Sequence, residues 1–212
     1  MTDPEKGDAQ PCPNTRAKLE EYLTEMIESP ERRREITKLL EETFSQERAV
    51  MVLDMSGFSR TTQRDGIVPF LLMIHQMKLV ARPAVAAHRG EIVKEEADNL
   101  FCLFGTVMDA VATSRDITER LAVVNLLLPE RKRLYVSIGI GFGRILNIEN
   151  QDLFGDEINV ASKLGEDIAQ MGQILLTQSA AQAVSDSDAA LELVEHSMSI
   201  SGLALQYYEV AK

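Results

Sequence analysis

Apolar residues along the chain follow two different spacings, which divide the sequence into two parts. Between residues 15 and 46 they recur at helical spacing on both sides of Ser29-Pro30, which predicts two amphipathic helices. From about Glu47 onward, short apolar runs alternate with helical stretches. The run Ala49–Met55 is almost continuously apolar, which is typical of a central strand. The pattern therefore predicts a helical extension followed by an α/β domain.

The order of elements in the second part predicts a ferredoxin-like β-α-β-β-α-β core, an α+β sandwich. After the first strand and a helix, Glu91–Lys94 and Leu100–Phe104 are predicted to form a hairpin. A second helix follows, and then the strand Leu134–Ile140. A further helix is expected from about Ile158 to Met171.

Three segments are expected from this pattern. Residues 1–14 are polar and rich in Pro, Asp and Gly, so we expect a flexible tail. Residues 15–46 form the helical extension and residues 47–212 the main domain. The extension has two possible interpretations: a plain helical hairpin packed on the main domain, or a dimerisation or regulatory element.

The composition narrows the class of protein. Of the 212 residues, 45% are hydrophobic and 26% charged, as in ordinary globular proteins. No apolar run reaches the ~18 residues of a membrane span, and the N-terminus lacks the features of a secretory signal. Two cysteines, Cys12 and Cys102, make no disulfide framework, so we expect a reduced, cytoplasmic protein. The net charge of −11 disfavours nucleic-acid polymers and anionic membranes, but not a small anion that arrives with a metal ion.

Two aspartates are candidates for such a metal site. Asp54 interrupts the apolar first strand just before a turn, and Asp98 lies at the tip of the predicted hairpin. In a ferredoxin-like sheet the first strand lies beside this hairpin, so the two carboxylates could meet and hold Mg²⁺. Gly57 permits a tight turn after Asp54, where backbone amides can cradle a phosphate. The residues alone equally allow Asp54 to cap the helix and Asp98 merely to make the turn.

Other polar residues are open to similar alternatives. Asn159 and Lys163 lie four apart on one helix face, where they could grip a phosphate or form an ordinary polar surface. If Glu96-Ala97 is the hairpin turn, Lys94 pairs with Asn99 and points to the face opposite Asp98.

The run GIGFG (139–143) contains three alternate glycines. It ends a predicted strand, and no helix follows at once. It is therefore not a dinucleotide-binding fingerprint.

Four blocks, in this order, resemble the class III adenylate/guanylate cyclase catalytic domain family. They are VLDMSGFS (52–59), GEIVKEEADNLFCLFG (90–105), the weaker SIGIGFGRIL (137–146) and DLFGDEINVASKL (152–164). The resemblance covers roughly residues 48–210. It implies a homodimeric enzyme with active sites between two chains, one chain supplying the metal ligands and the other the purine-binding residues.

The resemblance assigns a role to each candidate. Two metal ions, Mg²⁺ or Mn²⁺, would be held by Asp54, Asp98 and the backbone carbonyl of Met55. The phosphates would lie on the backbone amides of Gly57, Phe58 and Ser59.

The same resemblance assigns the nucleoside contacts. Lys94 and Asp152 stand where the purine-selecting pair stands, and Lys with Asp is the combination that selects ATP. Asn159 would orient the ribose. Lys163 occupies the position of a transition-state arginine.

Four positions depart from the family pattern. Lys163 keeps the charge of the arginine but loses its bidentate fork. Ser137 stands where many members use an arginine on the triphosphate, Ser201 where a phosphate-binding lysine is common, and Ala97 where glycine is usual. Three weakened cationic contacts would lower the rate of pyrophosphate release.

We therefore expect an adenylate cyclase, a phosphorus-oxygen lyase of signal transduction that converts ATP to 3′,5′-cyclic AMP and pyrophosphate. The departures keep an alternative open, a catalytically degenerate cyclase-like module that binds nucleotide or only dimerises. A guanylate cyclase is disfavoured by Lys94.

Overall fold

The computed structural model describes residues 13–56, 66–187, 190–200 and 203–211. A mixed sheet forms the centre of the main domain, with strand order β2-β3-β1-β4-β6-β8-β7 and β5 paired to β4. Its strands are β1 (Ser45–Met55), β2 (Glu91–Glu96), β3 (Asn99–Phe104), β4 (Val136–Ile148), β5 (Asp152–Phe154), β6 (Ile174–Thr177), β7 (Leu193–Ile200) and β8 (Leu203–Val210). β4 and β6 run parallel, whereas β1 is antiparallel to both β3 and β4.

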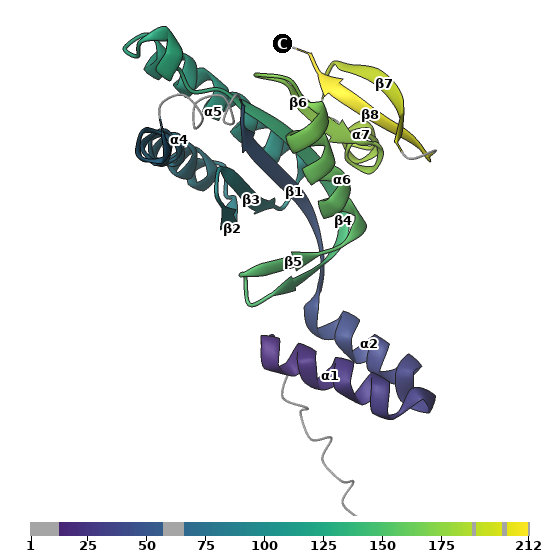
Figure 1. Ribbon diagram of the computed structural model, residues 1–212. Helices are drawn as coiled ribbons and strands as arrows, with labels where there is room; N and C mark the ends of the chain where they lie inside the picture. Colours follow the sequence, from purple (N-terminus) through teal and green to yellow (C-terminus); the bar gives the residue numbers. More distant parts are fainter. Residues whose placement is uncertain (1–12, 57–65, 188–189, 201–202, 212) are drawn as a thin grey trace, which may run out of the picture.

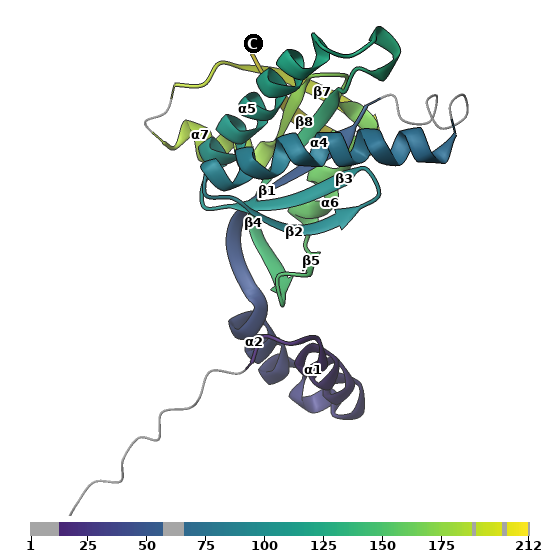
Figure 2. The same cartoon turned by 90° about the vertical axis from the view of Figure 1, so that its left-hand side faces the viewer.

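Helices cover both faces of this sheet (Figure 1, Figure 2). The helices are α1 (Arg16–Glu28), α2 (Arg33–Phe44), α4 (Ile67–Ala87), α5 (Val107–Asn125), α6 (Asp156–Ser162) and α7 (Gln178–Ser185), with a π-helical turn η3 (Lys163–Ile168) and 3-10 turns η1 (Pro30–Arg32) and η2 (Glu130–Lys132). The segment β1-α4-β2-β3-α5-β4 is the expected ferredoxin-like core, and the mixed α+β prediction is confirmed.

The alternation of β1 divides the core between the two faces. Met51, Leu53 and Met55 pack with α4 and α5 in the larger cluster. Val50 and Val52 pack on the other face with Ile158 and Ala161 of α6. Because strand side chains alternate, Asp54 points to the α6 face.

β1 and β4 are longer than the apolar pattern indicates. β1 begins at Ser45 rather than Ala49, and β4 continues past Ile140 to Ile148. The two strands pair without interruption from Ser45 opposite Leu146 to Met55 opposite Val136. Backbone hydrogen bonds thus continue through polar residues that carry no apolar signal.

The β2–β3 hairpin does not turn at Glu96-Ala97, so that possible turn was wrong. Glu96 pairs with Asn99, so Ala97-Asp98 forms the turn, and Lys94 lies opposite Phe101. Ala97 adopts φ +46°, a left-handed conformation that lets the hairpin close in two residues. Lys94 then lies 5.9 Å from the ring of Phe101, on the α6 face of the sheet.

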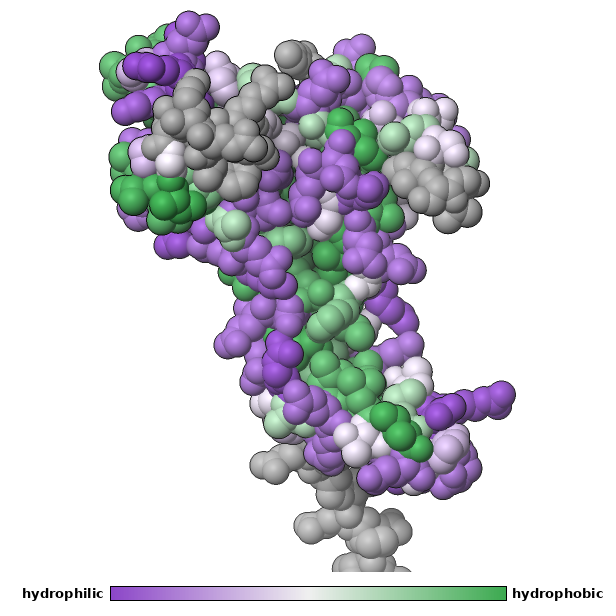
Figure 3. All heavy atoms as spheres, viewed as in Figure 1, coloured by the Kyte–Doolittle hydropathy of each residue, from purple (hydrophilic) through white to green (hydrophobic). Residues whose placement is uncertain are grey.

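The extensions of β1 and β4, together with β5, form an arm that carries the helical extension (Figure 1). Tyr22 of α1 and Ile36 and Phe44 of α2 pack with Ile148 of β4 in a small separate core. In Figure 3 apolar surface runs along this arm towards the helix pair. The extension therefore packs on β1 and β4 of the arm.

Candidate active site

Asp54 lies at the end of β1, opposite Ser137 of β4, and is half-buried. Burial, followed by repulsion from Asp98, raises the pKa of Asp54 from 3.8 to about 6. The structure thus brings Asp54 near Asp98, as the sequence predicts.

Asp98 is 9% exposed in the hairpin turn, and burial raises the pKa of its carboxyl as well. Two buried like charges are costly unless a proton or a cation joins them. A divalent cation fits this pair, because carboxylate oxygens are the ligands that Mg²⁺ and Mn²⁺ prefer. Across the described residues, no group of three or more His, Cys, Asp or Glu side chains is placed to hold a metal ion.

Glu166, in η3, is an acid near this pair that the sequence analysis did not single out. Burial raises the pKa of Glu166, and repulsion from Asp167, Glu96 and Asp98 raises it further. The helix was expected to be regular from about Ile158, whereas the chain changes to a π-turn at Lys163. The sequence feature that could have indicated this irregular turn is Gly165, a glycine followed by two acids inside a predicted helix.

Two glycines bring η3 against the sheet at this point. A Cβ on Gly139 would lie 2.0 Å from the carbonyl oxygen of Ala161, and one on Gly165 would lie 2.8 Å from that of Val52. The GIGFG run (139–143) lies inside β4, and not at the end of a strand as the sequence had indicated. Its function here is to admit backbone contact from the helical segment that carries Asn159 and Lys163.

The helical segment itself is held by Glu157 of α6. One carboxylate oxygen of Glu157 accepts hydrogen bonds from Phe142 N and Thr177 Oγ1, and the other from Ser179 Oγ. Asn159, two residues further along the helix, is exposed and lies on the same face as Lys163. Lys163 Nζ lies 2.5 Å from Asp167 Oδ2, so its cation is engaged within its own helical turn.

Lys94 and Asp152, from β2 and β5, also meet. Lys94 Nζ lies 3.4 Å from Asp152 Oδ1 and 2.7 Å from Glu96 Oε1. The second oxygen of Asp152 accepts a hydrogen bond of 2.5 Å from Arg16 Nη2, at the start of α1. Arg16 is the largest cause that lowers the pKa of Asp152. Sequence analysis missed Arg16, because nothing in its local pattern indicates where α1 docks.

The remaining expectations fall into two groups. Ser137 is 2% exposed and receives a hydrogen bond of 3.2 Å from Ser56 Oγ, so its short side chain fits a buried position. Gly57, Phe58, Ser59 and Ser201 lie outside the described residues, and their assigned roles remain predictions.

No protein-family model matches the chain. The protein named "Putative adenylate cyclase 3" from Rhizobium meliloti (strain 1021) is 31% identical over 129 residues, which are 61% of this chain and 22% of that protein. The matched part therefore spans about a fifth of this relative.

Solved structures show the same fold. An adenylate/guanylate cyclase/hydrolase from Silicibacter pomeroyi superposes with a TM-score of 0.64 and 24% identity, over 79% of this chain and 98% of that one. A bacterial light-regulated adenylyl cyclase superposes with a TM-score of 0.66 and 18% identity, over 92% of this chain and 63% of that one. The 8% of the 212 residues left unmatched, about 17, are fewer than residues 16–44 of the helix pair, so the likeness includes at least part of this pair.

No helix of the described segments is long and apolar enough to cross a membrane. The motif blocks, the ferredoxin-like core and the comparisons all point to the catalytic domain of nucleotide cyclases. The main domain therefore has the fold of the adenylate and guanylate cyclase catalytic domains, and over 129 residues its sequence is similar to that of a putative adenylate cyclase.

Proposed function

We propose that this chain is an adenylate cyclase that converts ATP to 3′,5′-cyclic AMP and pyrophosphate, working as a homodimer in the cytoplasm. The observation that carries the proposal is the meeting of Lys94 and Asp152 at 3.4 Å on the same face of the sheet as Asp54. A lysine can donate to N1 of adenine, and a carboxylate can accept from its exocyclic amine. Guanine presents the opposite hydrogen-bonding sense at these positions.

The metal ligands proposed are the Asp54 and Asp98 carboxylates and the Met55 carbonyl, with Mg²⁺ or Mn²⁺ as the ions. The ions would supply a lowered pKa for the ribose 3′-hydroxyl and positive charge for the triphosphate. Burial raises the pKa of both carboxyls, and repulsion from Asp98 raises that of Asp54 further, which supports this assignment because a cation would offset the cost of ionising them. The backbone amides of Gly57, Phe58 and Ser59 are proposed to cradle the phosphates.

The remaining residues position the nucleotide and stabilise charge. Asn159 holds the ribose so that its 3′-oxygen attacks the α-phosphorus in line with the leaving oxygen. The 3′-hydroxyl gives its proton to solvent, the new bond joins the 3′-oxygen to the α-phosphorus, the bond to the bridging oxygen breaks, and pyrophosphate leaves. Lys163 must leave Asp167 to stabilise the charge that develops on the phosphate oxygens.

Nucleotide binding without turnover is the second candidate function. It is favoured by the ion pair of Lys163 with Asp167, because the proposed catalytic cation is already neutralised. The small, buried Ser137 supplies no cation in its place.

The deciding experiment incubates the purified chain with ATP or GTP and Mg²⁺ or Mn²⁺, and separates the products by chromatography. We expect cyclic AMP with either metal, more with Mn²⁺, and none from the Asp54→Asn variant. The double variant Lys94→Glu/Asp152→Cys should lose ATP use at least several-fold, since a buried polar group without a partner costs ~1–3 kcal/mol. A wild-type chain that binds ATP but forms no product would establish the second candidate instead.

A mixed dimer tests whether each site is shared. Asp54→Asn and Asn159→Ala should each inactivate the homodimer. Co-expressed in equal amounts, half of the dimers are mixed and each has one intact site, so about a quarter of wild-type activity should return if the sites act independently. Activity that stays at the level of the single variants, with mixed dimers demonstrated, would place both groups in one chain.

A further inference from the structure

The start of α1 is fastened to the strand that carries Asp152. Asn14 Nδ2 donates to the carbonyl of Asn147 at 2.9 Å, and Asn14 Oδ1 accepts from the amide of Glu149 at 3.0 Å. Asn147 lies near the end of β4, and Glu149 lies in the turn that leads to β5. Arg16 follows directly and reaches Asp152 Oδ2 at 2.5 Å. Residues far apart in sequence are thus joined at one end of the arm.

Arg16 is poorly placed for stabilising its own helix. It is the first residue of α1, after the N-cap Thr15, and the first turn of α1 contains no acidic residue. A cation at a helix N-terminus opposes the helix dipole. The strongest favourable interaction of Arg16 is the contact across the arm to Asp152, ahead of the weaker attractions to Glu20 and Glu149.

The two oxygens of Asp152 have unequal partners. Arg16 holds Oδ2 tightly, whereas Lys94 lies 3.4 Å from Oδ1 and closer, at 2.7 Å, to Glu96. The Asp152 side chain is 21% exposed, so a ligand can reach it. Without Arg16, Lys94 would be the cation left beside Asp152 within the described segments, and Asp152 would turn towards it. A tight Lys94–Asp152 pair would withdraw both donor and acceptor from a purine.

We propose that Arg16 is a positioning residue for Asp152, holding one carboxylate oxygen so that the other stays available to the exocyclic amine of adenine. Selection of ATP over GTP then depends on the docking of the helical extension on the arm. This inference rests on the proposed function, in which Asp152 contacts the purine.

The experiment measures nucleotide preference without turnover. The full chain is titrated calorimetrically with 3′-deoxy-ATP and 3′-deoxy-GTP, which lack the attacking hydroxyl. Removing Arg16 in the Arg16→Ala variant should lower the preference for the adenine nucleotide about two- to fivefold, the range that an exposed charge pair supports. Arg16→Lys should retain most of the preference, because it keeps the charge.

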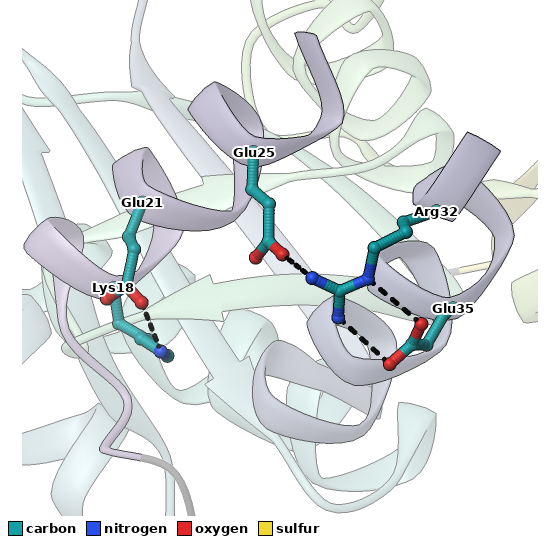
Figure 4. A network of polar contacts seen from close by, with 5 residues as sticks. All are labelled: Lys18, Glu21, Glu25, Arg32 and Glu35. Carbon is teal, nitrogen blue, oxygen red and sulfur yellow. Dashed lines mark hydrogen bonds and ion pairs between the residues drawn. The ribbon is translucent and has the colours of Figure 1, made fainter. Parts of the chain in front are cut away.

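A matched control lies in the same helical extension. Arg32 forms ion pairs with Glu25 and Glu35 only within the extension (Figure 4). Arg32→Ala should therefore keep the wild-type preference. In an Asp152→Ala background, Arg16→Ala should cause no further change, because its effect passes through the carboxylate.

The outcomes separate this inference from the proposed activity. A chain that prefers 3′-deoxy-ATP in an Arg16-dependent way but makes no cyclic AMP supports the inference and refutes the activity. An unchanged or higher preference in Arg16→Ala overturns the inference, as does an equal loss in Arg32→Ala or in the Asp152→Ala background. A wild-type chain that binds neither analogue also overturns it.

Discussion

Replacing Asp54 with asparagine should make the metal-free protein more stable while it abolishes the proposed activity. The folded state raises the pKa of Asp54 from 3.8 to about 6, so it favours the protonated, neutral carboxyl. One pKa unit corresponds to about 1.4 kcal/mol, which makes the full cost of ionising Asp54 about 3 kcal/mol. Because Asp54 is only half-buried, solvent reduces this to about 1–2 kcal/mol.

The sign of the pH dependence follows from the raised pKa. Below about pH 4 the carboxyl is protonated in both states, and the favourable contribution of the protonated group is fully present. Between about pH 4 and pH 6 the unfolded chain ionises first, so this contribution is lost. Above pH 6 the penalty is constant. Relative to Asp54→Asn, wild-type stability should therefore fall across pH 4–6 and stay level at higher pH.

Thermal and urea unfolding in EDTA across pH 4–8 measure this difference. At pH 8 we expect Asp54→Asn to unfold about 2–8 °C higher than wild type, and Mn²⁺ to raise the melting temperature of wild type alone. Asp116→Asn is the matched control, since Arg120 lowers the pKa of Asp116 and its loss should not stabilise the fold. The reasoning is refuted if Asp54→Asn is less stable than wild type at pH 8, or if the two pH profiles are parallel.

Three further substitutions test the supports of the site by urea unfolding. Gly139→Ala should destabilise the fold by about 3 kcal/mol or more, because its Cβ would lie 2.0 Å from the carbonyl oxygen of Ala161, whereas Gly105→Ala enters open space and should change stability by less than about 0.5 kcal/mol. A comparable loss of stability in both variants would show that the contact of Gly139 with the helix does not determine the cost of the substitution. Ala97→Gly should stabilise the fold by about 0.5–1 kcal/mol, because it relieves a non-glycine residue at φ +46°; a loss of stability would contradict this. Glu157→Ala leaves three donors without their acceptor and should cost about 2–4 kcal/mol together with activity, so unchanged stability would remove Glu157 as the anchor of α6.

Sequence periodicity and motif order were sufficient for the fold class and for the proximity of one pair of candidate site residues. The apolar run Ala49–Met55 and the hairpin around Asp98 predict adjacent strands, and the ferredoxin-like order predicts that Asp54 and Asp98 meet. The prediction for Asp54 was possible because the residues of a buried strand are apolar, so an aspartate within such a run stands out in the sequence. The spacing of Asn159 and Lys163 likewise determined their common helix face.

Tertiary structure alone decided the contacts that depend on pairing and docking. The polar start of β1 forms a strand because it pairs with the backbone of β4. The spacing of apolar residues cannot predict this pairing. The turn at Ala97-Asp98 depends on a left-handed residue that the sequence shows only as alanine. Arg16 and Asp152 meet because the helix pair docks on the arm, and a surface ion pair leaves no periodic trace in either segment. The fold could therefore be predicted from the pattern of apolar residues that become buried. The environment of Asp152 could not, because it depends on where the helical extension docks.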